Sequence, residues 1–289
     1  MSDIIIGSGP AGIATAIARL KRGREITILD IGHDLEPEAE ARRAAMAAKL
    51  PDLTERDRAE WMAPQFKTPP GQARRYGSDF AMQSADTVFD GGDSIALRSS
   101  HAAGGLSNLW GGAVLPWRQQ DIDDWPITAQ DLATHWQAVA ETMPVAGRVD
   151  ALQALFPAFD MAEKAALQTG PQIETLLARL AQAAGRLSLL GAHVGHARQA
   201  VNAPCHMCGL CLHGCPWQMI WSARHSLAKL RQNPAVTYRP GPMARAVLET
   251  AQGVRVEMSD GSSIKGTRVF VATGVLETAR ILMASPGGP

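Results

Sequence analysis

The sequence predicts an α/β fold built on a parallel sheet, and three observations predict it. A short apolar run, Asp3 to Ile6, leads directly into the glycine-rich turn Gly7 to Gly12. A helix-forming stretch and a second apolar run follow, which is the order of a βαβ unit. Near the other end of the chain, Val269 to Thr273 is a further apolar run that ends at a glycine. Continuous apolar runs of this length are typical of strands buried in a parallel sheet.

The turn carries the pattern G-x-G-x-x-G at Gly7, Gly9 and Gly12. In such a turn the first glycine permits the tight bend, the second lets the backbone approach a pyrophosphate, and the third allows close packing of helix on strand. The expected helix from Ile13 to Arg22 would direct its N-terminal N–H groups at the phosphates. The sequence therefore predicts a Rossmann-like dinucleotide-binding unit.

An acidic residue follows the glycine motif at the expected distance. The second strand, Glu25 to Leu29, ends at Asp30, and an acid roughly 20 residues after the motif meets a ribose hydroxyl in such folds. The alternative is a glycine-rich turn with a surface aspartate. The motif alone does not separate NAD from FAD.

Composition excludes several classes of protein. The chain has 289 residues, of which 46% are hydrophobic and 19% charged, so it is globular and large enough for one large domain or two ordinary ones. Lys and Arg number 28, as do Asp and Glu, and this balance gives no general electrostatic attraction to nucleic acid or anionic lipid. No apolar run reaches the ~18 residues of a membrane span. We expect a cytoplasmic protein.

The four cysteines, Cys205, Cys208, Cys211 and Cys215, form the run C-x2-C-x2-C-x3-C-P. Bacterial ferredoxins use this run to bind iron-sulfur clusters. A disulfide framework would spread its cysteines along the chain instead. The spacing therefore predicts an iron-sulfur loop that holds a [4Fe-4S] or a [3Fe-4S] cluster.

Other interpretations of the cysteines remain open. A structural zinc site would normally separate two cysteine pairs by a dozen or so residues, and a redox dithiol would leave two cysteines unexplained. In two-cluster ferredoxins the fourth cysteine of the run binds the other cluster, which this chain has no further cysteines to build. Either Cys215 binds the same cluster, or three cysteines hold it and one iron has no cysteine ligand. His206 and His213 are close enough in the sequence to be considered for that fourth position, although they can also be ordinary loop residues.

Further elements are expected along the chain. Helical patterns cover Pro37 to Leu50, Leu53 to Met62, Leu132 to Thr142, Ser222 to Gln232 and Leu276 to Met283. A further helical region runs from Ile173 to Leu189, and the spacing of its leucines indicates a side that faces the core. Strand patterns cover Val236 to Arg239, Ala244 to Glu249 and Val254 to Met258, the last two joined through Gln252-Gly253. The segment Gly104 to Gly112 contains four glycines, and such a loop either brings N–H groups close to a planar ligand or is an ordinary surface loop.

With these segments in place, the chain resembles the N-terminal part of the glucose-methanol-choline (GMC) family of flavoprotein oxidoreductases. Four pieces carry the resemblance in family order: Ile6 to Gly12; Gly104 to Gly112; Asp123 to Ile127 followed by Asp131-Leu132; and Ala272 to Leu282. The resemblance implies a Rossmann-like FAD-binding fold with helical insertions. It also implies an FAD-dependent dehydrogenase that acts on a CH–OH group of a sugar, polyol or other alcohol.

The resemblance also implies which residues bind FAD. The pyrophosphate would lie at the first glycine motif, the ribose at Asp30, the flavin against the second glycine loop and the adenine near Met243. The implied set is Gly7, Gly9, Pro10, Ala11, Gly12, Asp30, Gly105, Ser107, Asn108, Trp110, Gly111, Met243, Ala272, Thr273 and Gly274. Some relatives attach FAD covalently to a histidine where this chain has Leu109, so noncovalent FAD is expected.

The cysteine segment is similar to one in membrane-linked sugar and polyol dehydrogenases of the same superfamily, where a cluster carries electrons from flavin to an external acceptor or redox protein. The family's catalytic histidine lies in a C-terminal part beyond Pro289, and none of the eight histidines here matches its motif. We therefore name no catalytic base and expect a truncated chain that works with a C-terminal companion polypeptide. The alternatives are a noncatalytic FAD and iron-sulfur electron-transfer fragment, and a pyridine-nucleotide flavoprotein with a redox cysteine pair.

The resemblance and the patterns together divide the chain into six expected segments. These are 1–33, FAD-binding βαβ; 34–97, helical insertion; 98–127, flavin-contacting loop; 128–200, helical part; 201–225, iron-sulfur cysteine loop; and 226–289, FAD-binding strands and final helix.

Overall fold

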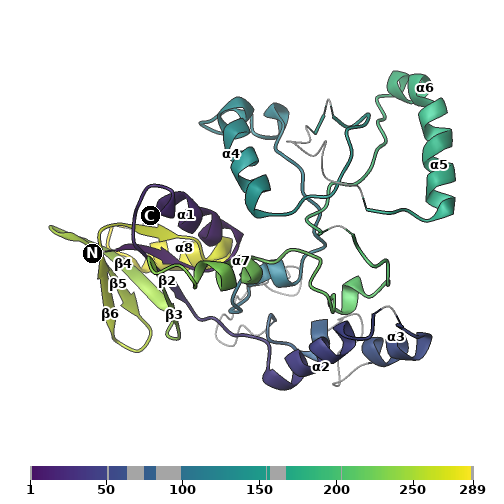
Figure 1. Cartoon of the computed structure of the whole chain (residues 1–289). Coiled ribbons are helices and arrows are strands. Elements are labelled where there is room, and N and C mark those ends of the chain that lie inside the picture. Colours follow the sequence, from purple (N-terminus) through teal and green to yellow (C-terminus); the bar gives the residue numbers. More distant parts are fainter. Residues whose placement is uncertain are drawn as a thin grey trace, which may run out of the picture. The chain divides into compact units, whose positions relative to one another are not determined.

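A computed structural model describes residues 2–50, 52–63, 75–82, 99–153, 155–156, 167–202 and 204–287. The chain divides into two compact units (Figure 1). Unit 1 consists of Met1–Trp110, Leu212–Pro216 and Ser222–Pro289, and unit 2 of Gly111–Cys211 and Trp217–Trp221. Within the described ranges, no helix combines the length and the apolar character that a membrane crossing needs.

Unit 1 is built on a parallel sheet. Its strands are β1 (Asp3–Ile6), β2 (Ile26–Asp30), β3 (Val236–Pro240) and β7 (Val269–Val271), in the order β3-β2-β1-β7. Each neighbouring pair is parallel. The first strand of the chain lies inside the sheet with later strands on both sides, as in dinucleotide-binding folds. The predicted α/β fold with a parallel sheet is confirmed.

Helix α1 (Pro10–Leu20) follows β1 through the glycine turn. It begins before the predicted Ile13, because Pro10 takes the first helical position, where its missing N–H costs nothing. A Cβ on Gly7 would lie 2.5 Å from the carbonyl oxygen of Ala272, and one on Gly12 would overlap the carbonyl oxygen of Gly7. Glycine at these two positions therefore lets α1, β1 and the end of β7 approach closely.

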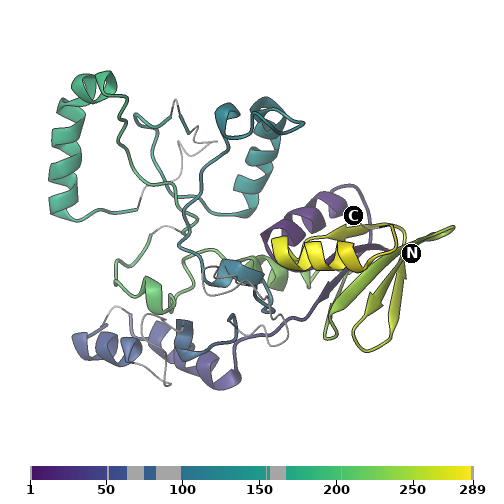
Figure 2. The ribbon, with the colours of Figure 1, turned by 180° about the vertical axis from the view of Figure 1, so that it is seen from behind.

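An antiparallel sheet completes the core of unit 1. It contains β4 (Ala244–Thr250), β5 (Gly253–Met258) and β6 (Ser263–Gly266) in that order, so the predicted hairpin is present. Helix α8 (Gly274–Ala284) packs against β4, and Figure 2 shows it beside α1 from the opposite side. The shared core is formed by Ile4, Ile6, Leu29, Ala244, Val256, Met258 and Ile281.

Three further helices of unit 1 are α2 (Pro37–Ala47), α3 (Glu55–Met62) and α7 (Ala223–Leu230), each shorter than predicted. Thr54 and Asp57 form a capping box that starts α3. Short 3-10 turns lie at Arg75–Gly77 and Gly105–Asn108, and in unit 2 at Gln119–Asp121. A further turn covers Cys211–His213.

Unit 2 contains α4 (Ala129–Thr142), α5 (Pro171–Gln182) and α6 (Ala184–Leu189). The helical region predicted from Ile173 to Leu189 is present, and a break at Ala183 (φ −93°, ψ 6°) divides it into α5 and α6. The predicted core-facing side was wrong. Leu176 is 49% exposed, and the fully described helix α5 has no buried residue. An apolar stripe predicts a helix with one apolar face, whereas burial also needs a partner for that face.

A buried ion pair fixes α1 to the parallel sheet. Asp3 in β1 is fully buried, and its Oδ2 atom accepts from Nε of Arg19 at 2.7 Å, with Nη2 also at 2.7 Å. The guanidinium also lies over the ring of Phe270 in β7. Arg24 lies farther from the same carboxylate, with its Nε 3.6 Å from Oδ2, so removing Arg19 would leave the buried charge only weakly compensated.

We predict that Arg19→Leu lowers the free energy of unfolding by about 3 kcal/mol, because the buried Asp3 then loses its close contacts with the Arg19 guanidinium and keeps only Arg24, 3.6 Å away, as a cation. The matched control is Arg22→Leu, which removes an exposed arginine at the end of the same helix. Chemical denaturation measures both variants. Equal effects of the two substitutions would contradict the assignment.

Candidate functional site

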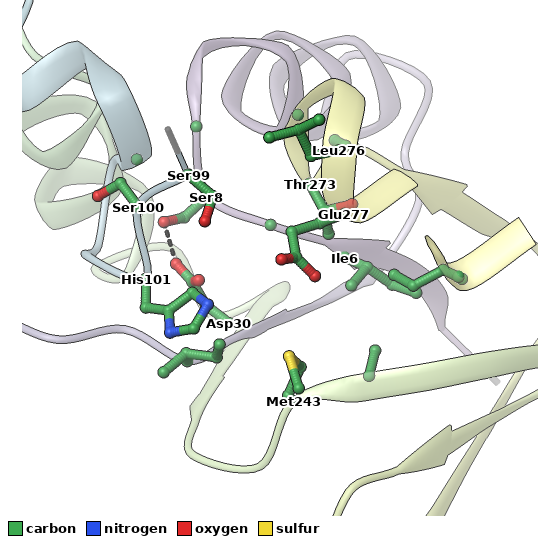
Figure 3. Close-up of a pocket in the computed structure, with 18 of the residues that line it drawn as sticks. Ile6, Ser8, Asp30, Ser99, Ser100, His101, Met243, Thr273, Leu276 and Glu277 are labelled. Atoms are coloured by element: carbon green, nitrogen blue, oxygen red, sulfur yellow. Dashed lines mark hydrogen bonds between the residues drawn. The ribbon is translucent and has the colours of Figure 1, made fainter. Parts of the chain in front are cut away.

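A cavity of about 500 Å³ lies in unit 1 at the carboxyl ends of β1, β2 and β7 (Figure 3). Ligands of open α/β sheets bind at this edge. Ten of the predicted cofactor-binding residues line it: Gly7, Gly9, Pro10, Ala11, Asp30, Gly105, Met243, Ala272, Thr273 and Gly274. The chain thus brings the glycine turn, the acid at the end of β2, the second glycine loop and the start of β4 together around one space.

The glycine turn presents backbone donors to this cavity. Gly9 is the N-cap of α1, no side chain caps the helix there, and its first turn contains no acid. The first N–H groups of a helix have no partner within the helix, and the helix dipole adds positive potential. A Cβ on Gly9 would meet no atom within 4 Å. This end of the cavity therefore suits an anion such as a phosphate.

Ser8 connects three segments of the site. The residue is buried, and its hydroxyl donates to Oδ2 of Asp30 and accepts from the backbone N–H of Gly104 at 2.8 Å. It therefore ties the glycine turn to the end of β2 and to the second glycine loop. Ser8 was not predicted as a site residue, because it occupies a variable position of the glycine motif. The only sequence signal is a hydroxyl between two glycines.

The carboxyl group of Asp30 faces the cavity beside Ser8 (Figure 3). Burial raises its pKa from 3.8 to about 6, although hydrogen bonds from the Ser8 hydroxyl and from nearby backbone N–H groups oppose this shift. The group is still ionised at neutral pH. It can then accept hydrogen bonds from a ligand hydroxyl, as predicted for the ribose.

The opposite wall is formed by Met243, Glu277 and Arg280. Oε2 of Glu277 accepts from Nε of Arg280 at 2.8 Å and from Nη2 at 2.5 Å, and the same Nη2 lies 2.7 Å from the sulfur of Met243. The sequence analysis did not single out Glu277, since an acid in the first turn of a helix is common for reasons of helix stability. His101 also lines the cavity, near Asp30 (Figure 3).

Five predicted residues do not line the cavity: Gly12, Ser107, Asn108, Trp110 and Gly111. Gly12 contributes close packing, and Gly111 belongs to unit 2. Ser107 and Asn108 are buried and hold the shape of their own loop. The Ser107 hydroxyl donates to the Gly104 carbonyl at 2.6 Å, and the Asn108 amide donates to the carbonyls of Ala103 and Gly105.

The same two side chains join the second glycine loop to α7. Oδ1 of Asn108 accepts from the hydroxyl of Ser222 at 2.9 Å, and the Ser107 hydroxyl accepts from the backbone N–H of Ala223. A Cβ on Gly104 would lie 2.5 Å from the backbone nitrogen of Arg224. These contacts fix the position of Gly105 at the cavity.

The four cysteines predicted to bind a cluster are all described by the structure. None of the four cysteines forms a disulfide; Cys208 and Cys215 are buried, and Cys211 is exposed. In the described part of the chain, no group of three or more Cys, His, Asp or Glu residues is arranged to hold a metal ion. Cys215 belongs to unit 1 and the other three to unit 2. The cluster therefore stays a prediction that rests on the spacing.

The segment that contains Cys215 is held by helices of unit 1. The indole Nε1 of Trp61 in α3 donates to the carbonyl of Gly214 at 3.1 Å, and Nη1 of Arg43 in α2 donates to the carbonyl of Pro216 at 2.5 Å. Gly214 has a positive φ of 92°, a conformation that favours glycine, and a Cβ there would lie 2.8 Å from the ring of Tyr76. These contacts explain why Cys215 is buried.

The fold is similar to that of a known oxidase. The structure matches pyridoxine 4-oxidase from Mesorbium loti over 98% of this chain, with a TM-score of 0.53 and 15% sequence identity. The match covers 51% of that protein, so the present chain spans about half its length. At this identity the similarity shows a shared fold alone.

Formate oxidase from Aspergillus oryzae RIB40, described in connection with FAD modification, also matches over 98% of this chain and 47% of its own. The identity is 15%, and the TM-score of 0.49 is too low to support an argument. No family model matches the sequence, and no curated protein does.

We predict that Asp30→Asn stabilises the nucleotide-free protein above pH 6. A folded-state pKa raised from 3.8 to about 6 means that the stability contributed by this group is complete below pH 3.8 and is lost as the pH rises through 6. An asparagine has no such loss. The difference in free energy of unfolding between variant and wild type should grow by about 2 kcal/mol from pH 4 to pH 7.

Urea denaturation at several pH values measures this difference. Asp260→Asn, at an exposed turn where hydrogen bonds from Ser262 lower the aspartate pKa, is the control. The free energy of unfolding of Asp260→Asn, relative to that of the wild type, should not increase as the pH rises. A constant difference for Asp30→Asn across the range would contradict the raised pKa.

Proposed function

We propose that unit 1 binds FAD noncovalently and that the chain is the cofactor-binding part of an oxidoreductase acting on a CH–OH group of a sugar, polyol or other alcohol. One observation carries the proposal. An uncapped helix N-terminus after a glycine turn and an ionisable acid at the end of the next strand face the same cavity, at the carboxyl edge of a parallel sheet. This combination suits a dinucleotide, which carries phosphates and ribose hydroxyls side by side.

Each end of the cavity would bind one part of the cofactor. The N–H groups at the start of α1 would bind the pyrophosphate, and Gly9 leaves room for it. The Asp30 carboxylate would accept a hydrogen bond from a ribose hydroxyl, while the Ser8 hydroxyl donates to its Oδ2 atom and holds it in place. Gly105, placed by the buried Ser107 and Asn108, would lie against the flavin half.

The preference for FAD over NAD rests on the resemblance to the GMC family. FAD would supply the hydride-accepting chemistry, and the chain would position it. A protein of similar fold is named as an oxidase of pyridoxine. Removal of the substrate's hydroxyl proton is proposed to fall to a C-terminal companion, and the electrons to pass to an external acceptor or redox protein. We derive no step through an iron-sulfur cluster, because the described residues do not assemble one.

We predict that Gly9→Ala weakens FAD binding at least tenfold without loss of stability. The added methyl group meets no protein atom within 4 Å, but it projects where the pyrophosphate must approach. Gly170→Ala is a matched control. Gly170 is also an extended N-cap residue followed by proline at a helix start, and a Cβ there also meets no atom.

Fluorescence titration with FAD and thermal denaturation measure the two properties. Gly170→Ala should bind FAD as the wild type does. Equal FAD affinity of Gly9→Ala and wild type would place the pyrophosphate elsewhere.

The function itself is tested on anaerobically purified protein. We predict flavin absorption bands after purification, and bleaching of these bands by a sugar or alcohol once a C-terminal companion is added. Bleaching by NADPH or NADH instead would favour a pyridine-nucleotide flavoprotein, and bound flavin that no alcohol reduces would favour a noncatalytic electron-transfer fragment.

Iron and acid-labile sulfide are assayed on the same sample. Bound zinc without iron would refute the predicted cluster, and protein that binds no flavin would refute the proposed function.

A further inference from the structure

The wall of the cavity opposite Asp30 contains a carboxylate that the proposed contacts do not use. Glu277 is 7% exposed, and Figure 3 shows its carboxylate directed into the cavity from α8. Its Oε2 atom receives both hydrogen bonds from Arg280. Its Oε1 atom is buried and has no hydrogen-bond partner within the described structure.

Helix stability does not account for this arrangement. An acid in the first turn of a helix interacts favourably with the helix dipole, and a pair with Arg280 three residues later adds to this. Both effects are available to a side chain that points to solvent. A buried carboxylate oxygen without a donor is costly, typically by more than a normal hydrogen bond contributes. A ligand donor in the cavity would remove this cost.

The proposed cofactor places a base at this wall. In a nucleotide the ribose lies between phosphate and base, so phosphates at Gly9 and a ribose at Asp30 direct the base toward Met243 and Glu277. The wall there is otherwise apolar, with Ala244 and Ile281 both buried at the cavity edge. An aromatic base can pack its face on such a surface, and its edge then needs polar partners.

We infer that Oε1 of Glu277 accepts a hydrogen bond from the 6-amino group of an adenine ring. The inference rests on the proposed function, since it requires an adenine nucleotide in the cavity. An ionised carboxylate accepts and never donates, so it pairs with an amino group and repels the 6-oxo group of hypoxanthine. Arg280 is a positioning residue that holds Oε2 and leaves Oε1 directed at the base.

The test compares ligands that differ in one group. ADP and purine riboside 5′-diphosphate are identical except that the second lacks the 6-amino group. Titration calorimetry gives the affinity of each for the full-length wild type and for Glu277→Leu, Glu277→Gln and Asp30→Asn, all purified without nucleotide. We expect the wild type to bind ADP about tenfold more tightly than the analogue, as loss of one hydrogen bond to a charged group implies.

The variants should separate a direct contact from a structural effect. Glu277→Leu should lose the preference for ADP by weakening ADP binding about tenfold while leaving the analogue unchanged. Glu277→Gln retains an uncharged acceptor and should restore part of the preference. Asp30→Asn should weaken both ligands by the same factor, because both carry the same ribose.

Three outcomes would overturn the inference. If Glu277→Leu weakens ADP and the analogue equally, Glu277 acts on the fold of the wall alone, and the proposed function stands. If wild type binds both ligands with equal affinity, the 6-amino group has no partner, whether or not Glu277→Leu folds. If wild type binds neither ADP nor FAD, the proposed function fails and the inference with it.

Discussion

The candidate site depends on the hydroxyl group of Ser8. Three segments that carry the site come from distant parts of the chain: the turn after β1, the end of β2 and the loop at Gly104. The Ser8 hydroxyl contacts the other two segments at once, through Asp30 and through the N–H of Gly104. Because the hydroxyl is buried, water does not compete for these bonds. Around it, the close approach of glycine backbones sets the distances between β1, α1 and β7.

Local patterns in the sequence were sufficient for the parallel sheet. Residues close in the sequence determine the conformation of the apolar runs that form β1, β2 and β7. The same holds for the glycine turn between β1 and α1. Helix α5 shows where such patterns fail. Its leucines predicted a helix correctly, but they do not specify which surface, if any, covers them, and Leu176 is 49% exposed. The break at Ala183 is marked in the sequence only by Gly185, two residues later, and an isolated glycine does not fix where a helix ends.

The backbone features of the candidate site could be predicted from the sequence, whereas side chains that complete its walls were missed. The glycines and Asp30 follow spacing rules that a single sequence reveals. Glu277 acquires its place only because α8 packs against β4, a contact between segments that no spacing rule connects. For Asn108, which the resemblance places at the flavin, the structure shows that both amide donors bond to carbonyl groups of its own loop. The cysteine spacing is specific, but the described residues do not realise it as a metal site.

The single proton of the Ser8 hydroxyl has a consequence for recognition. It is already given to Asp30, so this side chain has none left to donate to a bound phosphate. Pro10 lacks an N–H, and the remaining positions of the turn carry glycine or alanine. The turn itself can therefore offer a phosphate only main-chain N–H groups. Ligand choice at this end of the cavity then depends on the space that the glycines leave, and elsewhere on side chains that line the cavity, such as Asp30 and Glu277.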